Sequence, residues 1–351
     1  MSDLFELAHE DYFSPDLGSN WQLASLIGHD GILYFSHARH ALAHGLQIIG
    51  IAPGDKILFP GFVCRDLLSS LHSVGAVPVF YPVERDLTPG ALDSMPPAKA
   101  IVAINYFGFP QDLSPFQDYC LRTGATLVED NAHGLFSRDS AGRWLGTRAE
   151  IGIFSLRKTV PLPDGAALVA NNFNLRPKLG VQLPGCQLRV ISAATIKRLL
   201  CSPKFHFPPS AIRLATLANR MLRSLRTGRR LPAPNPESEY TLPGNPAPHI
   251  GLLSALGETN VARESVRRRG LYNRLARLIT NQGFELVFKT LPEGTVPYAL
   301  PFYATDAQAA RICQHLAGIN VDCVRWPDLP EAIKYSAPVH YHTIWMINFL
   351  W

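Results

Sequence analysis

Short apolar runs that alternate with helix-like segments constrain the fold of this chain more than any other feature of its sequence. Six runs have the length and composition of β-strands: Lys56–Phe59, Val77–Tyr81, Ala100–Asn105, Thr126–Glu129, Ile151–Ser155 and Ala167–Ala170. Helical apolar spacing separates most of them, at Ala41–Ile49, Asp66–Val74 and Pro115–Thr123. Because repeated strand–helix alternation gives a parallel sheet with helices on both faces, we predict a three-layer α/β/α domain with a mostly parallel sheet.

The length of the chain predicts a second, smaller domain. At 351 residues, the chain exceeds the ~250–300 residues at which a single hydrophobic core stops growing. We expect a large domain over 1–250 and a small C-terminal α/β domain over 251–351. A long helix over Leu252–Ile279 leads into the small domain. The further strand-like or helix-like runs of that domain are Glu285–Phe288, Tyr298–Tyr303, Ala307–Leu316 and Val321–Arg325.

Composition and the first residues predict a cytoplasmic globular protein. Hydrophobic residues make up 47% and charged residues 17% of the chain, which argues against disorder. No run approaches the ~20 apolar residues of a membrane span. The first twenty residues carry several acids instead of a basic and then apolar export signal. The six cysteines form no CxxC pair and no zinc-like spacing, so we expect reduced, structural thiols and no metal site.

A basic segment stands out in the charge pattern. Between Gly165 and Pro236 there is no Asp or Glu, but there are twelve Lys or Arg. Within it, Pro209–Arg226 has the pattern of an amphipathic helix with one apolar and one arginine-rich face. Such a helix either lies on an anionic membrane or an acidic partner, or packs on its own core with its arginines in water; the second is the commoner case. Nucleic acid is not an expected partner, because no recognised binding module accompanies the charge.

A proline-rich stretch follows the basic segment. Leu231–Pro248 contains six prolines. Proline removes a backbone donor and fixes φ, so a cluster of this density disfavours both helix and sheet. We predict a linker or an extended arm within the large domain.

An acid and an amine follow two of the predicted strands. Asp130 comes directly after the run Thr126–Glu129, and Lys158 comes shortly after the run that ends at Ser155. Ligands of parallel sheets bind at the carboxyl ends of the strands. A pyridoxal phosphate enzyme needs a lysine that forms an imine with the cofactor aldehyde, and a carboxylate that keeps the pyridine nitrogen protonated. The alternatives are a helix N-cap for Asp130 and a surface cation for Lys158.

An ordered series of short motifs resembles one enzyme family. The series comprises Pro53-Gly-Asp55, Pro60-Gly-Phe62, Gly75-Ala-Val-Pro-Val79, Tyr106-Phe-Gly-Phe-Pro110, Glu129-Asp130-x-Ala132-His133, Gly146-x-x-Ala149-x-Ile-Gly152, Phe154-Ser155 and Gly165-Ala-Ala-Leu-Val169. It is similar to the DegT/DnrJ/StrS aminotransferases, usually called sugar aminotransferases, from about Leu33 to Asn172. An ordered series is more specific than any single motif.

The resemblance implies a fold and a set of residue roles. It implies a fold type I pyridoxal phosphate enzyme that is a homodimer and moves an amino group from glutamate to a nucleotide-linked keto sugar, for a polysaccharide or a secondary metabolite. In this comparison Asp130 pairs with the pyridine nitrogen, and His133 takes the place of a family Gln or His beside the cofactor ring. Ser155 binds the phosphate, and Lys158 is the lysine that forms the imine.

The sequence departs from the family pattern at the segment that holds the phosphate. The family usually has Ser-Gly-Thr-x-Ala-Leu there, whereas this chain has Ser36-His-Ala-Arg-His-Ala-Leu42. The helix start at Ala38 still offers free N–H groups and a positive dipole, and Arg39 adds a charged donor. The spacing between Ser155 and Lys158 is also two residues shorter than is common in the family.

Two other functions remain open at this point. One is a noncatalytic relative that keeps the fold as a binding or assembly module, with a possible membrane contact through 209–226. The other is a lyase or dehydratase that uses the same cofactor without amino transfer; some sugar dehydratases of this family have lost the lysine to His. Retention of both Asp130 and Lys158 favours the aminotransferase.

Overall fold

The computed structural model describes most of the chain outside its start and the basic segment. It covers residues 21–160, 162–187, 235–318 and 321–349, together with Leu214, Ala218, Met221, Leu222, Leu225 and Arg226. These six residues of the predicted amphipathic helix are helical and exposed, so none of them belongs to the buried core. The rest of Pro209–Arg226 lies outside the described residues. Over the described ranges, no helix has both the length and the apolar character that crossing a bilayer requires.

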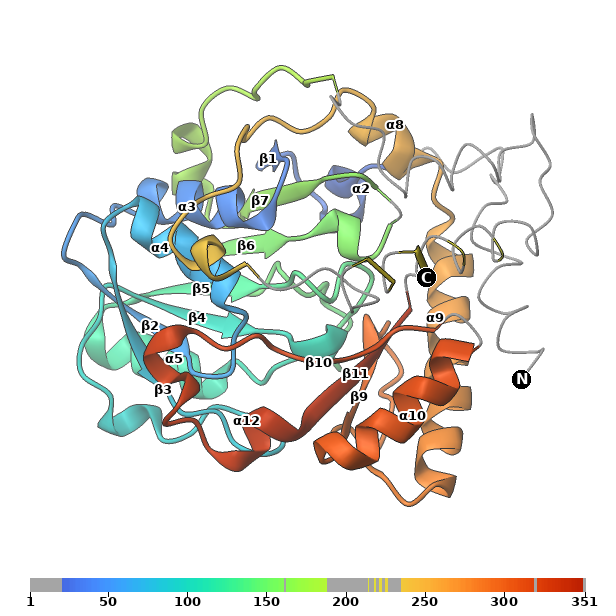
Figure 1. Cartoon of the computed structure of the whole chain (residues 1–351). Helices are drawn as coiled ribbons and strands as arrows, with labels where there is room; N and C mark the ends of the chain where they lie inside the picture. Colours follow the sequence, from blue (N-terminus) through green and yellow to red (C-terminus); the bar gives the residue numbers. More distant parts are fainter. Residues whose placement is uncertain are drawn as a thin grey trace.

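A seven-stranded sheet forms the centre of the N-terminal part. Its strands are β1 (Ile32–Phe35), β2 (Lys56–Pro60), β3 (Val77–Tyr81), β4 (Ala100–Ile104), β5 (Thr126–Asp130), β6 (Ile151–Phe154) and β7 (Ala166–Ala170). They lie in the order β1-β7-β6-β5-β4-β2-β3, and only β7 runs antiparallel to its neighbours (Figure 1). The six predicted strands are confirmed to within one residue at each end, whereas β1 was not predicted.

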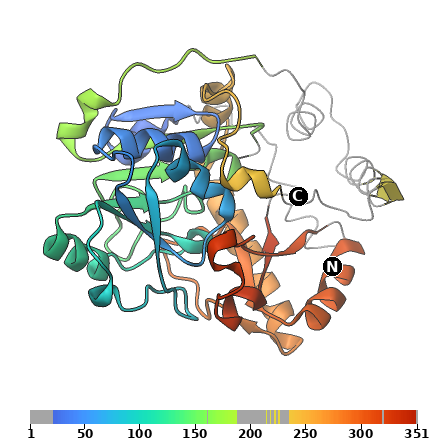
Figure 2. The ribbon, with the colours of Figure 1, turned by 60° about the vertical axis from the view of Figure 1, so that its left-hand side comes forward.

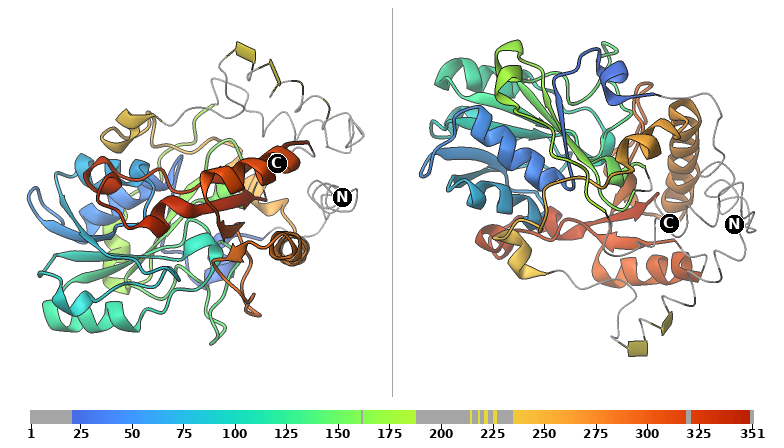
Figure 3. Two further views of the ribbon diagram at one scale, coloured as in Figure 1. Left: turned by 60° about the horizontal axis from the view of Figure 1, so that its bottom comes forward. Right: turned by 90° about the horizontal axis from the view of Figure 1, so that it is seen from above.

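Helices cover both faces of this sheet. Views from two further directions show α3 (Ala38–Ile48) and α4 (Ser69–Ser73) on one face and α5 (Ser114–Thr123) on the other (Figure 3). Helix α3 packs on β1, β6 and β7, and α5 packs on β4 and β5. Strands β4, β6 and β7 are buried along their whole length, because both faces are covered. The predicted three-layer arrangement is confirmed.

A smaller antiparallel sheet lies in the C-terminal part. Its strands are β8 (Glu285–Leu286), β9 (Ala299–Tyr303), β10 (Cys323–Arg325) and β11 (Ile344–Asn348), in the order β10-β11-β9-β8. Helix α9 (Val261–Asn281) packs on β8 and β9, and α10 (Asp306–Gly318) packs on β10. Figure 2 shows this unit, in orange and red, beside the large sheet.

Short helices and turns connect these elements. The short α-helices are α2 (Leu23–Ile27), α8 (Leu252–Gly257), α11 (Glu331–Lys334) and α12 (Val339–Thr343). The 3-10 turns are η1 (Arg65–Leu68), η2 (Leu92–Ser94), η3 (Tyr106–Gly108), η4 (Leu156–Lys158), η5 (Phe173–Lys178) and η6 (Pro236–Glu239). The helix predicted over Asp66–Val74 is therefore a 3-10 turn followed by α4.

The prediction of one long helix over Leu252–Ile279 is wrong. Helix α8 ends at Gly257, and α9 begins at Val261. Asn260 has an extended backbone, and its side chain accepts a hydrogen bond from the Arg263 N–H at 2.9 Å. This is an N-cap, in which a short polar side chain competes with the helical backbone and starts a new helix.

The two sheets share one hydrophobic core. A single cluster of buried side chains includes Phe59 on β2, Leu271 and Leu275 on α9, Phe302 on β9 and Ile347 on β11. The C-terminal unit therefore packs directly on the edge of the large one. The division into domains at residue 250 stays a prediction.

Candidate functional site

The carboxyl ends of β5 and β6 bring the predicted acid and amine together. Asp130 is the last residue of β5, where it pairs in register with Ile153 of β6. Ser155 directly follows β6, and Lys158 ends the 3-10 turn η4 that comes next. Because β5 and β6 are parallel neighbours, both chain segments leave the sheet at the same edge.

All six predicted site residues line one cavity at this edge. The cavity has a volume of about 200 Å³. The predicted residues around it are Ala38, Arg39, Asp130, His133, Ser155 and Lys158. The structure thus brings these residues together as predicted, while their catalytic and binding roles stay predictions.

The amine of Lys158 lies beside two stacked aromatic rings. Its Nζ is 2.9 Å from His133 Nε2 and 5.8 Å from the centre of the Tyr298 ring. Burial lowers the pKa of the Lys158 amine below its ordinary value of 10.5, and the Asp130 carboxylate opposes this shift only in part. A lower pKa increases the fraction of neutral amine, which is the nucleophilic form.

Asp130 is a buried carboxyl group. Its Oδ1 accepts a hydrogen bond from the Ala132 N–H at 2.8 Å, which fixes its orientation. Burial raises the pKa of Asp130, while the nearby Lys158 charge and the Ala132 hydrogen bond act in the opposite direction. A cationic ring nitrogen placed against this carboxyl would favour its ionised form for the same electrostatic reason.

The ring of His133 is buried among aromatic side chains. It stacks on Tyr298 with a centroid distance of 4.5 Å and an interplanar angle of 6°. Phe107 stacks on it at 5.8 Å, and its backbone N–H lies 3.2 Å from His133 Nδ1. Burial holds the pKa of His133 well below 6.5, and a charge on Lys158 would lower it further. His133 is therefore neutral at physiological pH.

The start of α3 forms the opposite end of the cavity. His37 is the N-cap of α3, has an extended backbone and makes no side-chain capping bond. The first N–H groups of a helix lack partners within the helix, so those of Ala38 and Arg39 can serve an anion. The Arg39 guanidinium lies 3.8 Å from Asp66, and Arg157 also lines the cavity. This end is therefore suited to a phosphate group.

The proline-rich arm packs against the start of α3. The Ser36 N–H donates to the Pro246 carbonyl at 2.8 Å, and the Ser36 hydroxyl donates to the Asn245 carbonyl at 2.7 Å. His40 Nε2 lies 2.6 Å from the Pro243 carbonyl. The described part of Leu231–Pro248 is thus an extended arm that is bound to the rest of the protein, and not a free linker.

The sequence did not identify the cavity wall that comes from the C-terminal unit. Tyr298 precedes β9, Trp326 follows β10, and Met346 lies on β11; all three line the cavity. Trp326 also packs on Phe62 and Phe107 with centroid distances of 5.2 and 4.9 Å. The only local signal for these residues is the Trp–Pro pair at the end of a short strand.

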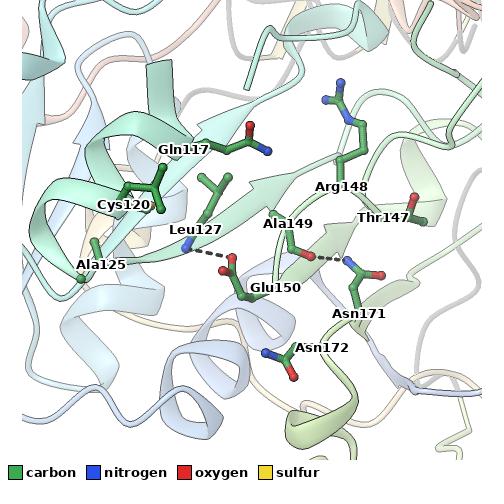
Figure 4. A pocket seen from close by; sticks show the side chains of 12 residues that line it. Gln117, Cys120, Ala125, Leu127, Thr147, Arg148, Ala149, Glu150, Asn171 and Asn172 are labelled. Carbon is green, nitrogen blue, oxygen red and sulfur yellow. Dashed lines mark hydrogen bonds between the residues drawn. The ribbon is translucent and has the colours of Figure 1, made fainter. Parts of the chain in front are cut away.

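A larger hollow lies at the other end of the strands (Figure 4). It has a volume of about 750 Å³. Its carboxylate, Glu150, accepts a hydrogen bond from the Leu127 N–H at 3.1 Å, and the Asn171 amide donates to the Ala149 carbonyl at 2.8 Å. These polar groups hold neighbouring chain segments together. We therefore locate the candidate site at the smaller cavity, where the titratable groups gather.

The described residues fit pyridoxal phosphate and offer no metal centre. The cavity has a basic end at a helix start for a phosphate, a lysine amine for an aldehyde, and a buried carboxyl group for a ring nitrogen. Across the described ranges, no group of three or more His, Cys, Asp or Glu side chains is arranged to hold a metal ion. Five of the six cysteines fall within these ranges, and all five are free thiols.

Comparisons with known proteins agree with this geometry. Residues 20–187 match the model of the DegT/DnrJ/EryC1/StrS aminotransferase family. The chain is similar to the aminotransferase TlmJ from Streptoalloteichus hindustanus, with a TM-score of 0.64 and 18% identity over 98% of this chain and 90% of that one. It is also similar to PseC of Helicobacter pylori, an aminotransferase involved in the biosynthesis of pseudoaminic acid, with a TM-score of 0.63 and 16% identity over 99% and 90% of the two chains.

A third similar structure is a dehydratase. It is the GDP-4-keto-6-deoxy-D-mannose-3-dehydratase of E. coli with bound hydrated PLP, with a TM-score of 0.58 and 14% identity over 93% of this chain and 85% of that one. At these identities the structural matches establish the fold, which is fold type I. The same fold therefore carries more than one reaction.

Proposed function

This chain belongs to the DegT/DnrJ/EryC1/StrS aminotransferase family, whose model it matches over residues 20–187, and we propose that it transfers an amino group from glutamate to a nucleotide-linked keto sugar. Pyridoxal phosphate is the cofactor of this family. The observation that carries the proposal is the single cavity shared by Asp130, His133, Ser155 and Lys158. The product would serve the synthesis of a polysaccharide or a secondary metabolite.

Different residues of the cavity would bind different parts of the cofactor. When bound, pyridoxal phosphate supplies the electron sink that allows an amino group to leave one substrate and join another. The N–H groups at the start of α3, the Arg39 guanidinium and the Ser155 hydroxyl would bind its phosphate. Asp130 would hold a proton on its ring nitrogen. Lys158 would bind its aldehyde carbon and then carry a proton on Nζ between donor and acceptor atoms.

We also propose that the protein works in the cytoplasm as a homodimer. The start of α3 lines the cofactor cavity and is held by the proline-rich arm. A second copy of the chain would add residues to this cavity. Light scattering of the purified full-length protein tests the dimer, since a monomer mass at micromolar concentration would reject it.

A dehydratase is the second candidate function. Two of the similar solved structures are dehydratases that act on GDP-4-keto-6-deoxymannose. Against this reading, the described turn after β6 keeps a lysine with its amine in the cavity. A noncatalytic binding module is less favoured, because a lysine amine of lowered pKa beside the buried Asp130 carboxyl group is typical of functional sites.

An absorption spectrum of the protein with pyridoxal phosphate, before and after borohydride, tests the proposal. We expect an imine band in the wild type that borohydride fixes on the peptide containing Lys158, and no such band in Lys158→Ala. Lys99→Ala is the matched control, because Lys99 is an exposed residue directly ahead of β4, at the opposite end of the strands. Equal bands in the wild type and Lys158→Ala would reject the lysine assignment and favour the binding module.

Substrate assays then separate the two enzymatic candidates. With glutamate as the donor, an aminotransferase releases 2-oxoglutarate in proportion to the amino sugar that it forms. A dehydratase instead removes water from the keto sugar, and the sugar gains no nitrogen. Mass spectrometry of the sugar product distinguishes the two outcomes.

A further inference from the structure

The backbone at Phe107 directs two polar groups at the site. Phe107 is fully buried and has a φ of +55°, which is a left-handed conformation that only a well-determined environment maintains in a residue other than glycine. Its N–H points at His133 Nδ1, 3.2 Å away, and its carbonyl accepts a hydrogen bond from the Tyr298 N–H at 2.8 Å. The next residue, Gly108, has no room for a side chain, because a Cβ would lie 2.9 Å from the His133 carbonyl oxygen. The turn at Phe107 and Gly108 is therefore held in place against His133 and Tyr298.

The Phe107 N–H determines which ring nitrogen of His133 carries a proton. A neutral imidazole has one N–H donor and one nitrogen acceptor. Nδ1 faces the Phe107 N–H, so Nδ1 must be the acceptor and Nε2 must carry the hydrogen. A protonated imidazolium would place two donors against each other at Nδ1, and burial of the ring disfavours it as well.

The Nε2–H of His133 then faces the Lys158 amine at 2.9 Å. An ammonium group has three donors and no acceptor, so it cannot accept this hydrogen bond, whereas a neutral amine accepts it through its lone pair. We propose that His133 is a positioning residue that holds the Lys158 amine in its neutral form and fixes its orientation before the cofactor binds. This role deepens the proposed function and rests on it, because only the neutral amine attacks an aldehyde.

The packing around His133 keeps its ring in this orientation. Tyr298 stacks on one face at 4.5 Å, and the Trp326 ring meets it edge-on at 5.4 Å. Since Phe107 also stacks at 5.8 Å, a rotation of the ring would have to displace aromatic groups from both the large sheet and the C-terminal unit. The donor at Nε2 is therefore directed at Lys158 by rigid surroundings.

Other charged groups near Lys158 do not restore the ammonium form of its amine. The titratable or charged groups that face Lys158 from the surrounding segments, besides His133, are Asp130, Cys64, Asp66, Arg157 and Tyr298. Burial raises the pKa of the Cys64 thiol to about 11 and also raises that of the Tyr298 phenol, so both are uncharged. Asp130 and Asp66 favour an ammonium group, Arg157 disfavours it, and burial of the amine outweighs the two carboxylates.

Nitrogen NMR of the cofactor-free, full-length protein tests the tautomer directly. The chain has twelve histidines, and ¹⁵N labelling of histidine distinguishes protonated from unprotonated ring nitrogens in each. The signals that disappear in His133→Leu identify the residue. We expect a protonated Nε2 and an unprotonated Nδ1 near neutral pH. A protonated Nδ1, or an imidazolium, would overturn the proposal.

Competitive acetylation measures the protonation of Lys158 itself. A trace of acetic anhydride modifies only neutral amines, so the yield on each lysine peptide, followed by mass spectrometry across pH, gives the pKa of that lysine. We expect the midpoint for Lys158 to lie below that of the exposed Lys99. In His133→Leu we expect it to rise by about half a unit to one unit, the size of one lost hydrogen bond to the neutral form.

The direction in which the Lys158 midpoint shifts in His133→Leu shows whether the Lys158 amine accepts a hydrogen bond from His133 or donates one to it. If Lys158 were an ammonium that donates to His133, loss of the acceptor would lower its midpoint, and this result or an unchanged midpoint would overturn the proposal. His44→Leu is the matched control, since His44 Nε2 contacts the Leu179 carbonyl and does not line the cavity. Neither measurement uses pyridoxal phosphate. A failure to bind cofactor would therefore reject the proposed function, whereas the tautomer of His133 and the pKa of Lys158 could still be measured and interpreted.

Discussion

Gly152 shows at the residue scale how closely the turn before β6 folds back on that strand. A Cβ on Gly152 would lie 1.9 Å from the Gly146 carbonyl oxygen. Gly146 itself has a φ of +86°, and its own Cβ would lie 2.3 Å from the Phe154 ring. The motif Gly146-x-x-Ala149-x-Ile-Gly152, which contributes to the family resemblance, thus has a steric cause. It allows the strand that leads to Ser155 to run beside its own connecting turn.

We predict that Gly152→Ala destabilises the protein by about 3 kcal/mol, because the backbone atoms of Gly146 cannot move away from the new methyl group without disturbing the strand. Urea unfolding followed by circular dichroism measures the change. Gly244→Ala is the matched control, since a Cβ there has no atom within 4 Å and its φ is not positive. A similar loss of stability in both variants would contradict the steric explanation.

At this scale the sequence predicted that Asp130 and Lys158 lie at one end of the sheet, but it did not predict what surrounds them. Asp130 and Lys158 were identified because each follows a predicted strand, and strand ends in a parallel sheet converge. Tyr298, Trp326 and Met346 follow no such rule, since they reach the cavity only through the packing of a second sheet. Their positions depend on contacts between segments far apart in the chain, which a local pattern does not encode.

At the element scale, helix α9 connects the site to the C-terminal unit through one buried guanidinium. Arg268 has no exposed surface. Its Nη2 donates to the Thr159 carbonyl at 2.8 Å, next to Lys158, and its Nη1 donates to the Tyr298 carbonyl at 3.3 Å. Its Nε donates to Glu264 at 2.6 Å. A single side chain therefore fastens the turn that carries Lys158 to the segment that carries Tyr298.

We expect Arg268→Met to lower the free energy of unfolding by about 3–5 kcal/mol, because it leaves the buried Glu264 carboxylate and three backbone carbonyl groups without this partner. Thermal or urea unfolding checks this value. Arg277→Met, on the exposed face of the same helix, should change stability by less than about 0.5 kcal/mol. Comparable losses in the two variants would show that the buried contacts do not account for the effect.

Helices and strands were predicted well where a local apolar pattern specifies them. They were predicted poorly where a single polar side chain determines where an element begins or ends. Strands β4, β6 and β7 follow their apolar runs, because burial on both faces requires continuous apolar residues. The break between α8 and α9 depends on the Asn260 side chain, which gives no signal in the apolar spacing. The prolines predicted a linker or an extended arm, but neither the 3-10 turn η6 nor the hydrogen bonds of this stretch to Ser36 and His40.

At the scale of the whole molecule, the two sheets form one packed body. The buried cluster that contains Phe59 and Leu58 of the large sheet also contains Tyr272 of α9 and Phe302 of the small sheet. We therefore predict that both units unfold in a single transition. Tryptophan fluorescence, which reports on Trp326 among others, and far-ultraviolet circular dichroism should give coincident urea curves. Two separated transitions would show that the units are independently stable and would support the predicted boundary at residue 250.

The cavity draws its wall from both ends of the described chain. His37 at the start of α3 and Met346 on β11 face the same space, and the start of α3 is held by the arm at Pro243–Pro246. During synthesis on the ribosome, the N-terminal sheet emerges long before the segments that complete this wall. A growing chain therefore lacks part of the wall around the cofactor until these last segments have emerged and folded.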